Sequence, residues 1–363
     1  MSTNKKPLMG EKPMKKFRRC VRGLAIAAFA LFLGGAVHAQ SPIYKITPEL
    51  EAAARKEGKI IHYTSIDVKV AQDIAKAFEK RYPEIKVQIE RNGAERQFAK
   101  IGQEYSSKIF NVDSVNSSDA AHFIYWKREG WLAAALPEEV SQRYPAGSFD
   151  TDGFYAPFRA GLSVIAYNTQ LVSAAEAPKS FKDLLDPKWK GKLVKAHPGY
   201  SGTILTSTFQ TSRELGWEFF EKLAAQQVMQ VQSSTDPPRK VTAGERPVMV
   251  DGNEYNVFIE QERGAPIAIV YPSEGTPLVI GPSGVMKNAP NPNAARLYHA
   301  WSFTLEAQQL AVEVGGIRSF HPDAKEPATR RPFKDIKVMK DDPIAVEKAV
   351  EDIKRRYTRY FKT

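Results

Sequence analysis

The segment Pro198-Gly199-Tyr200-Ser201-Gly202-Thr203 has the residue types of an anion-binding turn. It opens a stretch with helical spacing, and the first N–H groups of a helix lack partners and carry a partial positive charge. Gly202 would let an anion approach the backbone, and the Ser201 and Thr203 hydroxyls would add donors. A serine or threonine that only caps the helix explains the same spacing. The segment alone leaves both interpretations open.

Three other polar segments follow or end expected strands. They are Thr64-Ser65-Ile66-Asp67, Asn116-Ser117-Ser118-Asp119 and Asp251-Gly252-Asn253-Glu254-Tyr255. Ligands of open α/β sheets bind beyond the carboxyl ends of the strands, so the shared position of these segments favours a binding site over unrelated caps and turns. The candidate ligand-binding residues are therefore Ser65, Asp67, Ser117, Ser118, Ser201, Gly202, Thr203, Asn253, Glu254 and Tyr255.

Motifs of catalysis are missing from the sequence. It has no pair of histidines at metalloprotease spacing, no G-x-S-x-G elbow and no phosphate loop ending in Gly-Lys-Ser/Thr. The histidines after the leader are scattered, and we expect structural roles for all of them: His62, His122, His197, His299 and His321. The sequence therefore predicts no catalytic residues and no enzyme. A secreted hydrolase with an unrecognised site is the weaker alternative.

Strand and helix patterns alternate along the chain. Strands are expected near 59–64, 85–89, 112–115, 192–194, 248–250 and 267–270, and helices near 70–82, 98–105, 121–131, 201–209, 293–303, 305–314 and 346–360. Two extended segments, 158–167 and 278–285, would cross between two units. This pattern predicts an α/β protein of two lobes, each a mixed or parallel sheet flanked by helices, joined by a two-strand hinge. One large α/β domain is the alternative.

The expected division of the chain follows from the two crossings. Lobe 1 would comprise 40–160 and 281–322, and lobe 2 would comprise 161–280 and 323–363. A ligand would bind in the cleft, and closure of the lobes would bury it.

Residues 1–39 have the pattern of a cleaved secretory signal peptide. Basic residues precede an apolar run of 14 residues, 24–37, and Val37-His38-Ala39 resembles a cleavage site. As a helix the run would span about 21 Å, short of a bilayer core of about 30 Å. The leader carries a net charge of +7 of the chain's +11 and the only cysteine, Cys20. The exported chain would be periplasmic, monomeric and free of cysteine. Because most of the positive charge leaves with the leader, the exported chain would be only mildly basic, which argues against a nucleic-acid partner.

Several segments then indicate a family. Phe181-Lys182-Asp183-Leu184-Leu185-Asp186-Pro187-Lys188-Trp189-Lys190-Gly191-Lys192 resembles a signature of bacterial periplasmic binding proteins of the ferric-iron type, within the family-1 extracellular solute-binding proteins of ABC importers. Ile60–Phe78, the Ser201-Gly202-Thr203 turn and Gly315-Gly316-Ile317-Arg318 are similar as well. The resemblance covers essentially the whole exported chain. It implies the type II periplasmic-binding-protein fold, delivery of solute to an inner-membrane ABC permease, and a C-terminal helix packed on lobe 2.

The iron site of the family does not carry over. Ferric-binding relatives use a histidine, a glutamate and two adjacent tyrosines, and these positions fall on Asp67, Ser118 and Glu254-Tyr255. The resemblance also implies that the Ser201-Gly202-Thr203 turn holds an anion, and here its donors are intact. We therefore expect no metal and no cofactor. A remodelled ferric-iron site of Asp67, Glu254 and Tyr255 is the alternative, since Fe³⁺ prefers anionic oxygens.

The leading hypothesis is a periplasmic binding protein for a small organic anion with a phosphate, phosphonate, sulfonate or carboxylate head. Asp67 and Glu254 could face an amine, which would suit a zwitterion such as an aminophosphonate. Arg96 and Arg318 are further candidate cations for the cleft. The basic run 354–359 is expected to be the solvated face of the last helix.

Overall fold

Residues 43–363 are described by the computed structural model, and their core is built on two five-stranded sheets. The predicted signal peptide lies outside the described residues. Within 43–363, no helix combines the length and apolar character that a membrane crossing requires.

The first sheet has the order β3-β2-β4-β12-β6. Its strands are β2 (Lys59–Thr64), β3 (Lys86–Arg91), β4 (Ser114–Asn116), β6 (Ala156–Leu162) and β12 (Leu278–Val285). β2 pairs in parallel with β3 and β4, whereas β12 is antiparallel to β4 and β6. The carboxyl ends of β2 and β4 therefore meet at one edge, where the sequence predicted polar segments.

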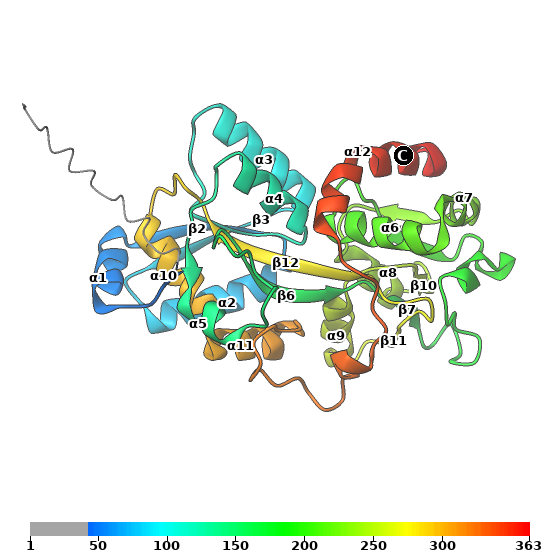
Figure 1. Cartoon of the computed structure of the whole chain (residues 1–363). Helices are drawn as coiled ribbons and strands as arrows, with labels where there is room; N and C mark the ends of the chain where they lie inside the picture. The colour runs from blue at the N-terminus through cyan, green and yellow to red at the C-terminus, as the bar shows by residue number, and fades with distance from the viewer. Residues whose placement is uncertain (1–42) are drawn as a thin grey trace, which may run out of the picture. The chain divides into compact units, whose positions relative to one another are not determined.

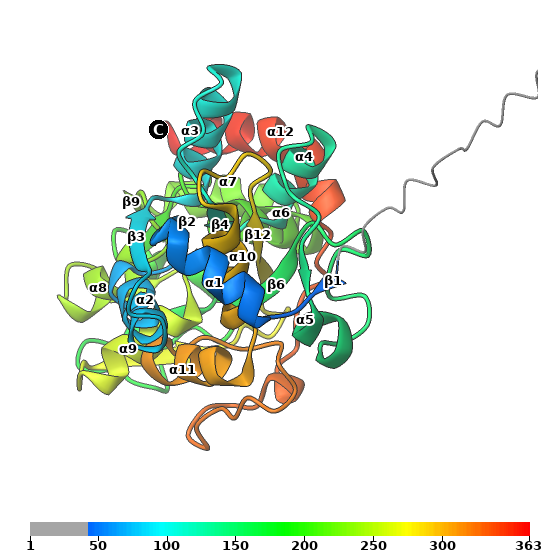
Figure 2. The same ribbon diagram turned by 90° about the vertical axis from the view of Figure 1, so that its left-hand side faces the viewer.

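Helices cover both faces of this sheet. They are α1 (Pro48–Glu57), α2 (Val68–Arg81), α10 (Pro292–Ser302) and α11 (Leu305–Gly315) on one face, and α3 (Ala94–Ser106) and α4 (Ala120–Arg128) on the other. Alternate residues of β2 explain the division, because Ile60 joins the first apolar cluster and Tyr63 joins the second. Figure 2 shows α1 and α10 side by side at the end of the sheet.

The second sheet has the order β11-β7-β10-β8-β9. Its strands are β7 (Ile165–Asn168), β8 (Leu193–Ala196), β9 (Met229–Val231), β10 (Val248–Met249) and β11 (Ile267–Val270). Its helices are α6 (Gly202–Leu215), α7 (Trp217–Ala225), α8 (Asp236–Thr242) and α9 (Glu254–Glu262). Short elements complete the chain: β1 (Ile43–Tyr44), β5 (Leu136–Pro137), α5 (Glu138–Arg143) and the 3-10 turns η1 (Lys182–Leu185), η2 (Pro187–Trp189) and η3 (Phe333–Asp335).

We call each sheet with its helices a lobe. Two extended connections join the lobes, since β6 runs into β7 and β11 leads to β12. β6 and β12 pair with each other over most of their length, and Figure 1 shows them as two long neighbouring strands. The α/β class with two mixed sheets is therefore confirmed.

The last helix, α12 (Pro343–Phe361), packs more widely than the resemblance implied. It contacts α6 and α7 of the second lobe, but also α4 of the first. Ala121 of α4 shares an apolar cluster with Leu205 of α6 and Val346 of α12. Arg128 of α4 also pairs with Glu347 at 2.8 Å. The expectation that this helix packs on lobe 2 is thus incomplete, because α12 joins both lobes.

Candidate functional site

The polar segments of the first lobe lie together and are buried. Ser65, Asp67, Ser117 and Ser118 all have less than a tenth of their surface exposed. The pairing of β2 with β4 brings the segments side by side, and Ser65 N–H donates to the Asn116 carbonyl at 3.2 Å. Asp67 caps α2 by accepting from Lys69 N–H at 3.0 Å. Each segment therefore caps or extends an element at the carboxyl end of its strand.

The start of α6 closes against these segments from the second lobe. A Cβ at Gly202 would come within 2.8 Å of Asp119 Cβ and within 3.3 Å of Ser118 Oγ, so only glycine fits without a shift. Ser201 caps α6 by accepting from Ile204 N–H at 3.4 Å, and Thr203 is buried beside it. Ser118 and the predicted anion-binding turn thus lie in contact.

The start of α9 contributes the remaining predicted residues. The Tyr255 hydroxyl accepts from Asp67 N–H at 3.1 Å, which joins the two lobes directly. Asn253 donates to Ser234 Oγ at 2.9 Å. Burial raises the pKa of the Tyr255 phenol, although the nearby Arg159 guanidinium acts in the opposite direction. The phenol is therefore neutral at physiological pH.

Arg159, which was not among the predicted site residues, lies beside the same segments. It lies on β6 and is 4% exposed, and its guanidinium donates to Asn116 Oδ1 and, at 3.2 Å, to Ser65 Oγ. Among the described residues no carboxylate lies within 4 Å of this guanidinium. Burial lowers its pKa to about 10, so it stays charged. A single arginine in the apolar run 156–162 was the signal in the sequence.

Two further guanidinium groups lie close to the same segments. Arg239 Nη2 pairs with Asp67 Oδ2 at 2.7 Å. Arg91 donates to the Ile66 carbonyl at 3.3 Å and to Ser233 Oγ at 2.9 Å. Of the three guanidinium groups, only that of Arg239 pairs with a carboxylate, whereas those of Arg91 and Arg159 donate to neutral groups. We call Ser65, Arg91, Ser118, Arg159, Ser201, Gly202, Thr203 and Tyr255 the interlobe site.

Glu254 has a structural partner instead of a free carboxylate. Its oxygens accept from Arg318 Nε at 2.7 Å and Nη2 at 2.9 Å, and from the Tyr271 hydroxyl. Arg318 in turn pairs with Glu326 at 2.6 Å, so Glu254 and Arg318 both have charged partners within the protein. Arg318, a candidate cation for the cleft, is instead paired with two carboxylates.

Arg96, the other candidate cation, is exposed. Its guanidinium donates to Gln232 Oε1 at 2.7 Å and lies over the Tyr200 ring. Arg96 thus links the lobes at the surface, outside the interlobe site.

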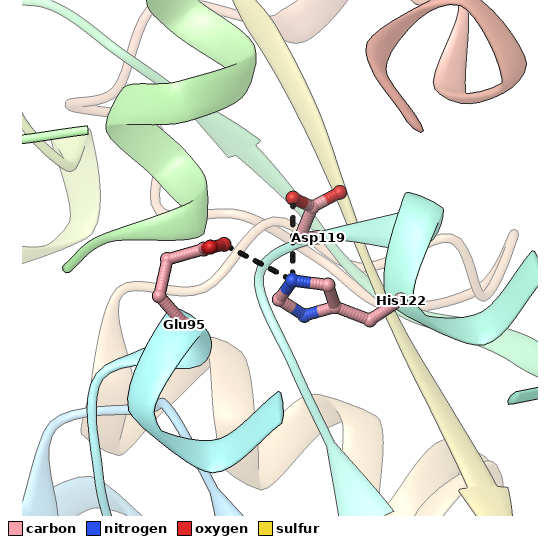
Figure 3. A group of neighbouring side chains, drawn as sticks. All are labelled: Glu95, Asp119 and His122. Carbon is pink, nitrogen blue, oxygen red and sulfur yellow. Dashed lines mark hydrogen bonds and ion pairs between the residues drawn. The ribbon is translucent and has the colours of Figure 1, made fainter. Parts of the chain in front are cut away.

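A second polar cluster lies beneath Gly202, formed by Glu95, Asp119 and His122. His122 Nε2 lies 3.0 Å from Glu95 Oε1 and 3.7 Å from Asp119 Oδ2. Figure 3 shows the contacts of the imidazole with both carboxylates. Lys354 of α12 pairs with Glu95 Oε2 at 2.7 Å. The expectation that the run 354–359 is only a solvated face is therefore wrong for Lys354, which reaches across to α3.

These observations define a class of protein: two α/β lobes joined by paired crossing strands, with polar strand ends and helix starts facing each other between the lobes. The sequence agrees, because residues 73–344 match the family described as bacterial extracellular solute-binding protein. The chain belongs to this family and is a periplasmic solute-binding component of an ABC importer.

Sequence relatives support this assignment. An uncharacterised protein of Haemophilus influenzae is 28% identical over 277 residues, which is 73% of this chain and 79% of that protein. A putative 2-aminoethylphosphonate-binding periplasmic protein of Salmonella typhimurium is 27% identical over 178 residues, covering 46% of this chain and about half (51%) of the relative.

Solved structures show the same fold. The periplasmic binding protein AfuA of Actinobacillus pleuropneumoniae, with fructose-6-phosphate bound, superposes with a TM-score of 0.77 at 24% identity over 84% of this chain and 99% of that one. Iron-bound HitA of Pseudomonas aeruginosa gives a TM-score of 0.71 at 20% identity over 82% and 99%. The family and these neighbours are binding proteins.

Proposed function

We propose that this protein captures a small organic anion between its lobes and delivers it to an inner-membrane ABC permease. The observation that carries the proposal is Arg159. A buried charge without a partner is costly, and buried cations in folded proteins are normally paired. An anionic head beside Arg159 would supply that missing partner when the lobes close.

Neutral donors elsewhere in the interlobe site suit the same ligand. Ser65 and Ser118 offer hydroxyls from the first lobe, and the start of α6 offers backbone N–H groups with Ser201 and Thr203. Helix starts attract anions through their free N–H groups and dipole. Ser117 and Asn253 lie in the same buried segments and would contribute to the walls of the site.

The paired carboxylates narrow the chemistry of the ligand. Asp67 is held by Arg239, and Glu254 is held by Arg318. Neither is free to pair with an ammonium group, so the structure gives no support to the aminophosphonate hypothesis. We infer a ligand that has an anionic head and no ammonium group that would need a protein carboxylate. Phosphoryl heads have additional support, since the ligands named for AfuA and for the Salmonella relative both carry phosphorus.

Ferric iron is the second candidate, because HitA binds iron. Its proposed oxygens here would come from Asp67, Glu254 and Tyr255. Two of these already face guanidinium groups, and the third is a protonated phenol that accepts from Asp67 N–H. A trivalent cation would have to displace two arginines and sit near Arg159. The geometry therefore favours the anion over the metal.

A thermal-shift panel tests the proposal. The exported chain would be screened against inorganic phosphate, sugar phosphates, phosphonates, sulfonates, dicarboxylates and ferric citrate. A ligand at about 100 times its Kd stabilises the folded protein by about 2.7 kcal/mol. We expect at least one organic anion to raise the Tm. We also expect one molecule of this anion to bind each protein monomer. A shift with ferric citrate that requires the iron, and none with any anion alone, would contradict the proposal.

A further inference from the structure

We propose that Glu95, Asp119 and His122 form a site for a divalent metal ion of the zinc class, held by one imidazole nitrogen and two carboxylate oxygens. None of these residues belongs to the interlobe site or to the ferric-iron alternative. The inference is independent of the proposed function, because a failed search for an anion would leave it untouched.

The spacing of the three ligand atoms fits a common ion. His122 Nε2 lies 3.0 Å from Glu95 Oε1 and 3.7 Å from Asp119 Oδ2, and all three atoms lie within 4.8 Å of one another. Zinc bonds to nitrogen and carboxylate oxygen measure about 2.0–2.2 Å, which places neighbouring ligands of a tetrahedral site roughly 3.3–3.6 Å apart. Small side-chain adjustments would therefore complete the site, and Figure 3 shows the three side chains converging.

Asp119 supplies a second and independent observation. Its Oδ1 accepts from Ala121 N–H at 2.9 Å, which fixes the carboxylate as the cap of α4. Its Oδ2 is buried without a hydrogen-bond partner among the described residues and lies on the side of His122. Buried polar atoms in folded proteins almost always have a partner, so this oxygen calls for one. A cation between Oδ2 and Nε2 would provide it.

Other contacts hold the imidazole in the orientation that a ligand needs. His122 Nδ1 lies 3.4 Å from Ser117 Oγ, and the ring stacks on Phe98 at 4.5 Å. Ligating histidines commonly use their second nitrogen in a hydrogen bond that sets the tautomer. The three ligands come from α3, from α4 and from the residue that caps α4, all in the first lobe, so the site does not require contact between the lobes. Two carboxylates and one histidine suit zinc with a position left open.

Lys354 is a neighbouring cation that uses a different oxygen. Its ammonium group lies 2.7 Å from Glu95 Oε2, whereas His122 faces Oε1. The lysine and the metal therefore do not need the same atom, but their charges repel each other. If the cluster binds a metal, removing the lysine charge should strengthen metal binding. If the cluster is only a structural ion pair, removing the lysine would only weaken the ion pairing of Glu95.

Metal binding by the exported chain tests this inference. After treatment with a chelator, the protein would be titrated with zinc chloride by calorimetry and with cobalt chloride by visible absorption. We expect one equivalent of zinc and visible Co²⁺ d–d bands. Asp119→Asn and His122→Gln should each weaken zinc binding at least tenfold, and Lys354→Met should tighten it severalfold. His321→Gln is the matched control, because His321 pairs with a single carboxylate, Glu139.

Two outcomes would overturn the site. One is the absence of zinc binding by the wild-type chain at millimolar zinc, and the other is unchanged binding in both ligand variants. Circular dichroism would establish that each variant folds. Asp119→Asn decides alone if His122→Gln does not fold, since asparagine keeps the volume and can still accept from Ala121 N–H.

Discussion

The hydroxyl of Tyr255 accepts a hydrogen bond of 3.1 Å from the backbone N–H of Asp67. This bond joins the start of α9 in the second lobe to the start of α2 in the first. The Asp67 carboxylate is occupied separately, by Lys69 N–H and Arg239. The phenol is therefore a neutral contact between the lobes, placed close to the buried guanidinium of Arg159.

Replacement of Tyr255 by phenylalanine should weaken ligand binding, because it removes a hydrogen bond that holds the two lobes together around the ligand. The variant loses one hydrogen bond between neutral groups and leaves Asp67 N–H unpaired, which costs about 1 kcal/mol, or roughly fivefold in affinity. Isothermal titration with the ligand found in the thermal-shift panel would measure the change. A hundredfold loss would instead indicate that the phenol binds the ligand itself, and no loss would show that the contact has no role in closure.

Replacement of Arg159 by methionine should separate binding from stability. The variant loses two hydrogen bonds, but it also removes a buried charge without a carboxylate partner. These effects oppose each other, so we expect the unfolding free energy of the ligand-free protein to change by no more than about 1 kcal/mol. Affinity for the anion should fall at least a hundredfold, about 2.7 kcal/mol.

Arg213→Met is the control for this variant. Arg213 is half exposed on α6 and pairs with Asp342 at 3.5 Å, so its loss should leave affinity and stability nearly unchanged. Equal affinity in the Arg159 and Arg213 variants would refute the role given to Arg159.

Replacement of Arg318 by methionine should damage stability and spare binding. The Arg318–Glu254 pair is buried on both sides, and removal of one partner leaves Glu254 without its guanidinium. Breaking such a pair costs about 3–5 kcal/mol. Chemical denaturation would measure this loss, and titration with ligand should give an affinity within about threefold of wild type. A large loss of affinity in a folded variant would return Glu254 and Arg318 to the binding site.

The Arg263–Glu260 pair lies at the end of α9, the helix that begins at Glu254, and gives a matched comparison for the Arg318 variant. Arg263 is half exposed, and its contact with Glu260 spans 3.0 Å at the surface. Arg263→Met should cost less than about 1 kcal/mol.

Acid should destabilise the protein through buried histidines of the first lobe. Burial, aided by His299, lowers the pKa of His62 to about 3, and burial lowers the pKa of His299 to about 4. In the unfolded chain a histidine has a pKa of about 6.5. Below pH 6.5 the unfolded state therefore binds more protons than the folded state, and stability falls with falling pH.

The expected slope for each histidine rises from about 0.7 kcal/mol per pH unit at pH 6.5 to about 1.4 kcal/mol per pH unit near pH 5. His62→Gln keeps a polar group near Ser114 Oγ, the partner of His62 at 2.7 Å, and should make the pH dependence shallower by about one such contribution. Unfolding by urea across this window measures the slope. An unchanged slope in the variant would show that His62 does not contribute.

Local patterns predicted the framework well. The β-rich run 59–64, the long extended segment 278–285 and the Ser201 cap each correspond to an element, namely β2, β12 and α6. These features follow from contacts between residues close in the chain, and the sequence shows them directly. α1 was missed although Thr47 caps it and Gly58 ends it at φ +69°, because its amphipathic pattern is weak.

Side-chain partners were much harder to predict. Glu254 and Asp67 were expected to face the ligand, but arginines distant in sequence, Arg318 and Arg239, hold them. Lys354 meets Glu95 across the fold in the same way. Such pairs depend on how the elements pack, and no local spacing encodes them. Arg159 was not predicted as a site residue for a different reason. It lies in an apolar extended segment, and this pattern predicted only a strand that crosses between the lobes.

A crystal structure of the protein with the anion that raises its Tm tests most directly whether an anion binds beside Arg159. We predict an anionic oxygen within about 3.2 Å of an Arg159 guanidinium nitrogen, with the Ser201-Gly202-Thr203 turn against the ligand. A bound ligand that leaves Arg159 without an anionic partner, or a metal ion held by Asp67 and Tyr255, would contradict the account.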